Sequence, residues 1–117
     1  MKPCLYNNGK RHKVQAMKIY ISGQITGMPE LNEPAFASAS RAIAEKGHVP
    51  INPFDVCCDI PRGSDWLSYM RADIKAMMDA DSVLMLPNWT GSRGANVEYS
   101  IAVFLDIPIY HSVDNIQ

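Results

Sequence analysis

Apolar residues along the chain follow two patterns that alternate. Short apolar runs have the length of buried strands, and they occupy residues 18–22, 48–52, 81–86 and 107–110. Between them, apolar positions recur every three or four residues, as on one face of a helix, over residues 34–46, 65–79 and 92–105. The pattern therefore predicts four strands that alternate with three helices.

Turn-forming residues mark the ends of these elements. Pro34 suits the first position of a helix, and Gly47 ends that helix. Residues 53–63 contain two prolines and a glycine, which predict an irregular connection, and Asp65 or its neighbour Ser64 caps the helix that follows. We expect residues 112–117 to be frayed.

Alternating strands and helices with short apolar strands predict an α/β protein. We expect a small doubly wound parallel sheet, of the flavodoxin or Rossmann kind, with about four to five strands and helices on both faces. In such a sheet, ligands bind beyond the carboxyl ends of the strands, where the strand order switches. Three segments converge there: residues 22–27, 52–63 and 87–95.

Composition narrows the class of protein further. The chain has 117 residues, 47% of them apolar and 20% charged, which predicts one globular domain over residues 17–117. Residues 1–16 carry four basic residues and no acidic one, so we expect a basic, flexible tail and regard nucleic-acid binding as the less favoured interpretation. No apolar run has a membrane-spanning length and no secretory signal is present, so we expect a cytoplasmic protein with no membrane contact.

The cysteines and histidines do not form a recognisable framework. Cys4, Cys57 and Cys58 are odd in number and two are adjacent, which predicts reduced thiols rather than disulfides. The three histidines are scattered, so we predict neither a metal site nor a cofactor.

Two acidic residues lie on apolar helix faces. Glu98 is the only charged residue between positions 98 and 105, and its helical neighbours are apolar. Asp73 borders the apolar stripe of the preceding helix, beside Met70 and Met77. Such a carboxylate needs a partner or a function. At this point Glu98 is either a structural residue bonded to a nearby group or a catalytic one, and Asp73 is either catalytic or a marginal residue reaching water.

The start of the last helix is suited to an anion. Ser92, Arg93 and Gly94 offer a hydroxyl, free backbone N–H groups and the positive end of the helix dipole, although an ordinary serine cap explains the same residues. The chain has no Walker loop and no GxGxxG sequence, which argues against ATP or dinucleotide binding. Paired carboxylates in different environments can divide the roles of nucleophile and general acid.

At these residues the sequence resembles the nucleoside 2-deoxyribosyltransferase superfamily, and functionally the 2′-deoxynucleoside 5′-monophosphate N-glycosidases. The pattern Y-x-x-G-x-I-x-G is present as Tyr20, Gly23, Ile25 and Gly27, and S-x-G-x-x-x-E as Ser92, Gly94 and Glu98. Asp73 precedes the pair Ala80-Asp81, as in the family. The sequence also resembles small uncharacterised phage and prophage proteins of this superfamily.

The resemblance implies an enzyme that cleaves or transfers at the N-glycosidic bond of a nucleoside or nucleotide. Glu98 would be the nucleophile that captures C1′, Asp73 would help protonate the leaving base, and Tyr20 would hydrogen-bond Glu98. The resemblance also implies a substrate pocket; its residues would be Ser22, Gly23, Gln24, Ile25, Gly27, Met28, Trp89, Ser92, Arg93 and Gly94. Met28 and Trp89 would stack on the base. A homodimer or larger homo-oligomer is expected on the same grounds.

One rival hypothesis needs no catalysis. The same loops suit a module that binds a nucleotide or an ADP-ribose-like ligand, for example a phage-encoded one. Such a module would have no use for an ionised nucleophile at Glu98.

Overall fold

The computed structural model describes residues 15–61 and 63–117, so most of the basic tail lies outside the described residues. Its centre is a sheet of four parallel strands, β1 (Lys18–Ser22), β2 (Val49–Ile51), β3 (Ser82–Met85) and β4 (Ile109–Tyr110). The strands lie in the order β2-β1-β3-β4. This arrangement confirms the predicted doubly wound parallel sheet, and it places the switch in strand order between β1 and β3.

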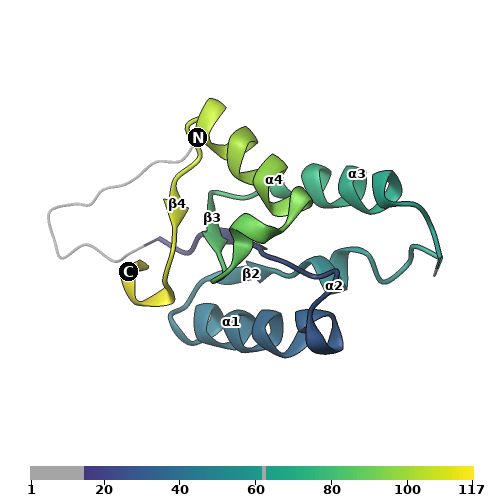
Figure 1. Cartoon of the computed structure of the whole chain (residues 1–117). Coiled ribbons are helices and arrows are strands. Elements are labelled where there is room, and N and C mark those ends of the chain that lie inside the picture. Colours follow the sequence, from purple (N-terminus) through teal and green to yellow (C-terminus); the bar gives the residue numbers. More distant parts are fainter. Residues whose placement is uncertain (1–14, 62) are drawn as a thin grey trace, which may run out of the picture.

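Helices cover both faces of the sheet, as predicted (Figure 1). On one face lies α1 (Glu33–Glu45), and on the other lie α3 (Trp66–Met77) and α4 (Arg93–Phe104). A four-residue helix, α2 (Pro53–Val56), follows β2. Three short 3-10 turns complete the described chain: η1 (Pro29–Asn32), η2 (Trp89–Gly91) and η3 (Val113–Asn115).

Alternate residues of the central strands build two separate cores. Ile19 and Ile21 of β1 face α1, together with Leu84 of β3. Tyr20 faces the other way, with Val83 and the residues of α3 and α4 that pack there. This two-residue period of a strand also determines the site, because it turns Tyr20 and Ser22 to the same side of the sheet.

Two expectations about irregular segments are wrong. The connection after β2 contains α2, because Asn52 caps it by accepting a hydrogen bond from the Phe54 N–H (3.0 Å) and Pro53 occupies its first turn. The C-terminal residues are ordered rather than frayed. Ile116 is 1% exposed and packs into the core on the α1 side, and the Lys46 ammonium donates to its carbonyl oxygen at 2.6 Å.

Candidate functional site

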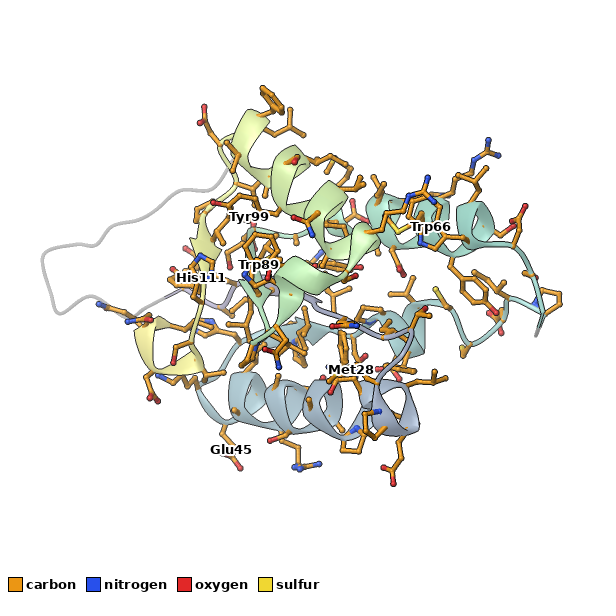
Figure 2. The ribbon with its side chains drawn as sticks, viewed as in Figure 1. Met28, Glu45, Trp66, Trp89, Tyr99 and His111 are labelled. Atoms are coloured by element: carbon orange, nitrogen blue, oxygen red, sulfur yellow. The ribbon has the colours of Figure 1, made fainter. Side chains whose placement is uncertain are left out.

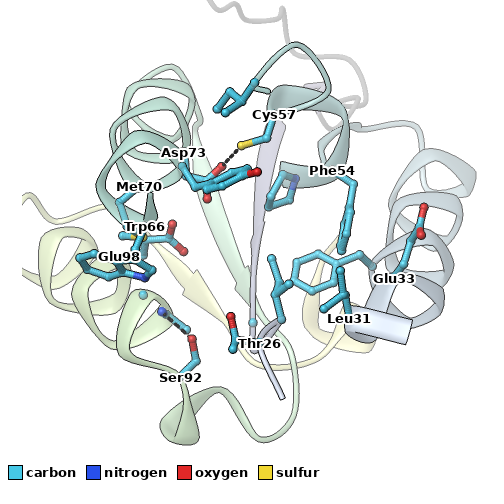
Figure 3. A pocket seen from close by; sticks show the side chains of 18 of the residues that line it. Thr26, Leu31, Glu33, Phe54, Cys57, Trp66, Met70, Asp73, Ser92 and Glu98 are labelled. Atoms are coloured by element: carbon cyan, nitrogen blue, oxygen red, sulfur yellow. Dashed lines mark hydrogen bonds between the residues drawn. The ribbon is translucent and has the colours of Figure 1, made fainter. Parts of the chain in front are cut away.

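A cavity of about 690 Å³ opens beyond the carboxyl ends of β1 and β3. Figure 3 shows Glu98, Asp73 and Trp66 on one side of this cavity, with Phe54 and Leu31 facing them from the other side. The first group comes from α3 and α4, and the second from α2 and η1. The cavity therefore lies where the three segments predicted to converge meet.

Glu98 of α4 is 4% exposed, and both of its carboxylate oxygens are hydrogen-bonded. The Tyr20 hydroxyl donates to Oε2 at 2.9 Å, and the Ser22 hydroxyl donates to Oε1 at 2.7 Å. The predicted Tyr20–Glu98 hydrogen bond is therefore present. Because Tyr20 and Ser22 are two residues apart on β1, both point at the helix that packs on this face, and together they fix the carboxylate in one orientation.

Burial raises the pKa of Glu98 from its ordinary 4.5 to about 7. The hydrogen bond from Ser22 opposes this shift, the charge of Asp73 adds to it, and the hydrogen bond from Tyr20 again opposes it. Burial also raises the pKa of Tyr20 well above its usual range, so its phenol stays a hydrogen-bond donor.

Asp73 of α3 is the second buried carboxylate, at 8% exposed. The Cys57 thiol, at the end of α2, donates to its Oδ1 at 3.1 Å (Figure 3). Burial raises the pKa of Asp73 from 3.8 to about 6, and the hydrogen bond from Cys57 opposes this rise. Asp73 thus faces the cavity as a buried residue instead of reaching into bulk water.

Glu98 and Asp73 titrate as a pair near neutral pH. With pKa values of about 6 and about 7, the pair holds one proton between these pH values. Two hydroxyl donors stabilise the Glu98 anion, whereas Asp73 accepts one weaker bond from a thiol. Because the pKa of Glu98 is the higher of the two, the proton lies mainly on Glu98, and the two hydroxyl donors stabilise the less populated arrangement with Glu98 ionised and the proton on Asp73.

The start of α4 contacts α3 closely. The Ser92 hydroxyl accepts from the Ala95 N–H at 3.1 Å, as a helix cap does. A Cβ atom at Gly94 would lie 2.9 Å from the sulfur of Met70, so the glycine permits the close approach of the two helices. The Arg93 guanidinium lies over the Trp66 ring, 3.9 Å from its centroid.

The structure brings most of the predicted site residues to the cavity. The predicted residues that line it are Tyr20, Gly23, Ile25, Asp73, Ser92, Gly94 and Glu98. Ser22 reaches the site through its bond to Glu98, and Arg93 through its contact with Trp66.

Besides Ser22 and Arg93, four predicted residues lie outside the lining. Gln24 turns back to donate to the Thr26 carbonyl oxygen at 3.2 Å, and Gly27 and Met28 belong to the same loop. Trp89, expected to stack on a base, instead stacks on Tyr99 with the ring centroids 4.5 Å apart (Figure 2). The Trp89 ring thus packs against a residue of α4, and His111 lies beside the two stacked rings.

The cavity wall also contains residues that were not predicted as site residues, among them Phe54, Cys57 and Trp66. Phe54 and Cys57 belong to the connection after β2. This connection was expected to reach the site, but the helix α2, which directs its side chains to the cavity, was not predicted. Trp66 falls within the helix predicted over residues 65–79, where an apolar residue is expected to face the core. Within the described residues, no group of three or more histidine, cysteine or acidic side chains is arranged to hold a metal ion.

Comparison with solved structures places the fold in a known class. A 2-deoxyribosyltransferase from the psychrotolerant bacterium Bacillus psychrosaccharolyticus superposes with a TM-score of 0.64 at 16% sequence identity, over 79% of this chain and 69% of that chain. The fold is thus a 2-deoxyribosyltransferase-like α/β fold. The chain itself belongs to the family described as Domain of unknown function (DUF4406), whose model matches residues 17–111. No sequence among curated proteins matches it.

None of the described helices combines the length and apolar character needed to cross a membrane.

Proposed function

We propose that the protein cleaves or transfers at the N-glycosidic bond of a deoxynucleoside through a glycosyl ester on Glu98. The observation that carries the proposal is the Glu98 carboxylate itself. It is buried at the wall of a cavity large enough for a small ligand, and two hydroxyl donors hold both of its oxygens. A carboxylate with only a structural role has no need to face such a cavity.

In the first step, an oxygen of ionised Glu98 attacks C1′ of the sugar. A new C–O bond forms while the bond from C1′ to the base nitrogen breaks, and the electron pair of that bond leaves with the base. Protonated Asp73 supplies the proton that the departing base requires. The products of this step are a free base and a sugar esterified to Glu98.

In the second step, water or another base attacks C1′ and releases Glu98. Asp73, now ionised, accepts the proton that the incoming nucleophile loses. The pair thereby returns to one proton shared between two carboxyl groups, as in the free enzyme. Whether hydrolysis or transfer follows depends on which acceptor occupies the space that the first base has left.

The charges of the cavity favour a nucleoside without a 5′-phosphate. Glu33 and Asp55 line it together with Asp73 and Glu98, and none of its described lining residues is lysine or arginine. A phosphate dianion in this cavity would lie among carboxylates, with no described cation in the lining to balance it. A neutral nucleoside avoids this cost.

The proposal is tested by incubating the protein with deoxynucleosides and with their 5′-monophosphates, followed by chromatography for free base. We expect base release by the wild type, faster from nucleosides, and loss of release in Glu98→Ala. Glu45→Ala, which removes an exposed carboxylate at the end of α1, is the matched control. Equal release by wild type and Glu98→Ala on every substrate would overturn the proposal.

The rival hypothesis, a binding module, predicts another outcome with the same proteins and ligands. A nucleoside or nucleotide would raise the melting temperature of wild type and Glu98→Gln alike, and no base would appear. That result would exclude the enzyme and leave the same cavity as a binding site.

A further inference from the structure

We propose that Cys57 is a positioning residue for Asp73: its thiol holds one carboxylate oxygen and leaves the other free to face the substrate. Its importance for catalysis rests on the proposed function, whereas its effect on Asp73 can be measured without any substrate. Cys57 Sγ lies 3.1 Å from Asp73 Oδ1, within hydrogen-bond distance for sulfur. Asp73 Oδ2 has no hydrogen-bond partner among the described residues.

The backbone of α2 aims the thiol at Asp73. Asn52 begins this helix through its side-chain cap, and Cys57 ends it, with its N–H donating to the Pro53 carbonyl oxygen at 2.9 Å. Both ends of the four-residue helix are therefore fixed by hydrogen bonds. The helix also packs against α3, which carries Asp73. The cysteine is thus held at a set distance from the carboxylate and is not free to swing around an exposed loop.

The chemistry of this thiol suits a permanent donor rather than a nucleophile. Burial and the neighbouring Asp73 raise the pKa of Cys57 from 9.0 to about 12, so the S–H bond persists across the pH range in which Asp73 titrates. A thiolate at this position would lie beside two carboxylates, which is the opposite of the electropositive surroundings of reactive cysteines.

The hydrogen bond from Cys57 has a predictable effect on the pKa of Asp73. A donor stabilises the ionised form of a carboxyl group more than the neutral form, so removing it raises the pKa of the carboxyl group. Cys58 provides an internal comparison, because it is adjacent in sequence but exposed, with its sulfur 3.8 Å from Asp59. A general effect of losing a thiol in this segment would appear in both residues, whereas a positioning role belongs to Cys57 alone.

The direct test is a carbon-13 NMR titration of the Asp73 carboxyl group, assigned with Asp73→Asn, in four proteins: wild type, Cys57→Ala, Cys57→Ser and Cys58→Ala. Cys57→Ala should raise the pKa of Asp73 by about one unit, the size expected for one hydrogen bond to a charged group. Cys57→Ser keeps a donor, and Cys58→Ala leaves the hydrogen bond between Cys57 and Asp73 intact, so both should titrate like the wild type. An unshifted Asp73 in Cys57→Ala, or the same shift in Cys57→Ser, would overturn the inference.

The reciprocal measurement uses the Cys57 thiol and leaves Cys57 in place. In a Cys4→Ser, Cys58→Ser background, Asp73→Asn removes the negative charge beside Cys57, so the fraction of thiolate rises. The rate of alkylation by iodoacetamide at constant pH should then increase about tenfold for each unit by which the thiol pKa falls. An unchanged rate would contradict the inference, even if Cys57→Ala did not fold.

Activity separates this inference from the proposed function. If the protein releases base, its pH–rate profile reports the pKa values of the Glu98–Asp73 pair and should move to higher pH in Cys57→Ala but not in Cys57→Ser. Released base together with an unmoved Asp73 titration would refute the role of Cys57 and leave the proposed function standing. No release of base, together with the expected titration shift, would refute the proposed function and leave the role of Cys57 standing.

Discussion

Replacing Glu98 with glutamine should stabilise the protein at alkaline pH, although it removes the proposed nucleophile. Burial raises the pKa of Glu98 from 4.5 to about 7, so the folded state holds this proton more tightly than the unfolded chain does. The stability that this group contributes is therefore fully present below about pH 4.5 and is lost as the pH rises through about 7. Between about pH 5 and pH 8, the loss in unfolding free energy amounts to about 2 to 3 kcal/mol.

Glutamine is neutral throughout this pH range, so the variant does not lose this unfolding free energy. It presents one acceptor oxygen to two hydroxyl donors, Tyr20 and Ser22, so one of these hydrogen bonds is impaired at a cost of about 1 kcal/mol that does not depend on pH. The variant should therefore be no more stable than the wild type at pH 5 and about 1 to 2 kcal/mol more stable at pH 8. A buried charge retained at such a cost is typical of functional sites.

Urea unfolding of both proteins at pH 5, 6, 7 and 8 measures this difference. Glu45→Gln serves as the control, because an exposed carboxylate should leave the pH dependence of the wild type unchanged. Parallel stability curves for wild type and Glu98→Gln across the range would refute the reasoning, since they would show that folding does not change the ionisation of Glu98.

Three further substitutions test separate parts of the structure. Tyr20→Phe removes one donor to ionised Glu98, so the pKa of Glu98 should rise and the pH–rate profile should move to higher pH; an unmoved profile would contradict this role. Gly94→Ala places a methyl group 2.9 Å from the sulfur of Met70, and urea unfolding should show a loss of about 1 to 3 kcal/mol, partly restored by Met70→Ala in the same chain. Ile116→Ala empties a buried position and should cost about 2 to 4 kcal/mol, whereas Gln117→Ala beside it should change stability little; similar values for both would mean that the C-terminus does not anchor the core.

The sheet could be predicted from the sequence because its signals are local. Each strand is a short apolar run, and each long helix has a periodic stripe between a cap and a stop, so residue spacing alone determines the order of elements. The alternation along β1 even implies that Tyr20 and Ser22 share a face. That face meets α4, and the Tyr20–Glu98 hydrogen bond follows from this packing.

The other parts of the site depend on contacts that local patterns do not encode. Asn52-Pro53 is a sound helix start, but a helix of four residues has no apolar period, and the segment was interpreted as irregular. Without that helix, nothing in the sequence brings Cys57 to Asp73. Trp89 was assigned to the cavity because of its place in a loop, whereas the partner that occupies it, Tyr99, lies ten residues further along the chain. Tertiary packing decides which of two aromatic residues is free to contact a ligand.

The C-terminal segment illustrates the same limit. Residues 112–117 carry few apolar side chains, which is why fraying was expected, yet one of them fills the core beside α1. The buried Ile116, the partly buried Val113 and one hydrogen bond from Lys46 anchor the segment. The average composition of the segment does not reveal that one of its residues is buried in the core.

The central claim is that Glu98 forms a covalent bond to the sugar. The most direct measurement mixes the protein with a deoxynucleoside, quenches the mixture rapidly in acid and weighs the intact protein by mass spectrometry. The account predicts a species heavier by one deoxyribosyl group, with the added mass on the peptide that contains Glu98, and no such species in Glu98→Gln. Base release without any adduct, or an adduct that persists in Glu98→Gln, would contradict it.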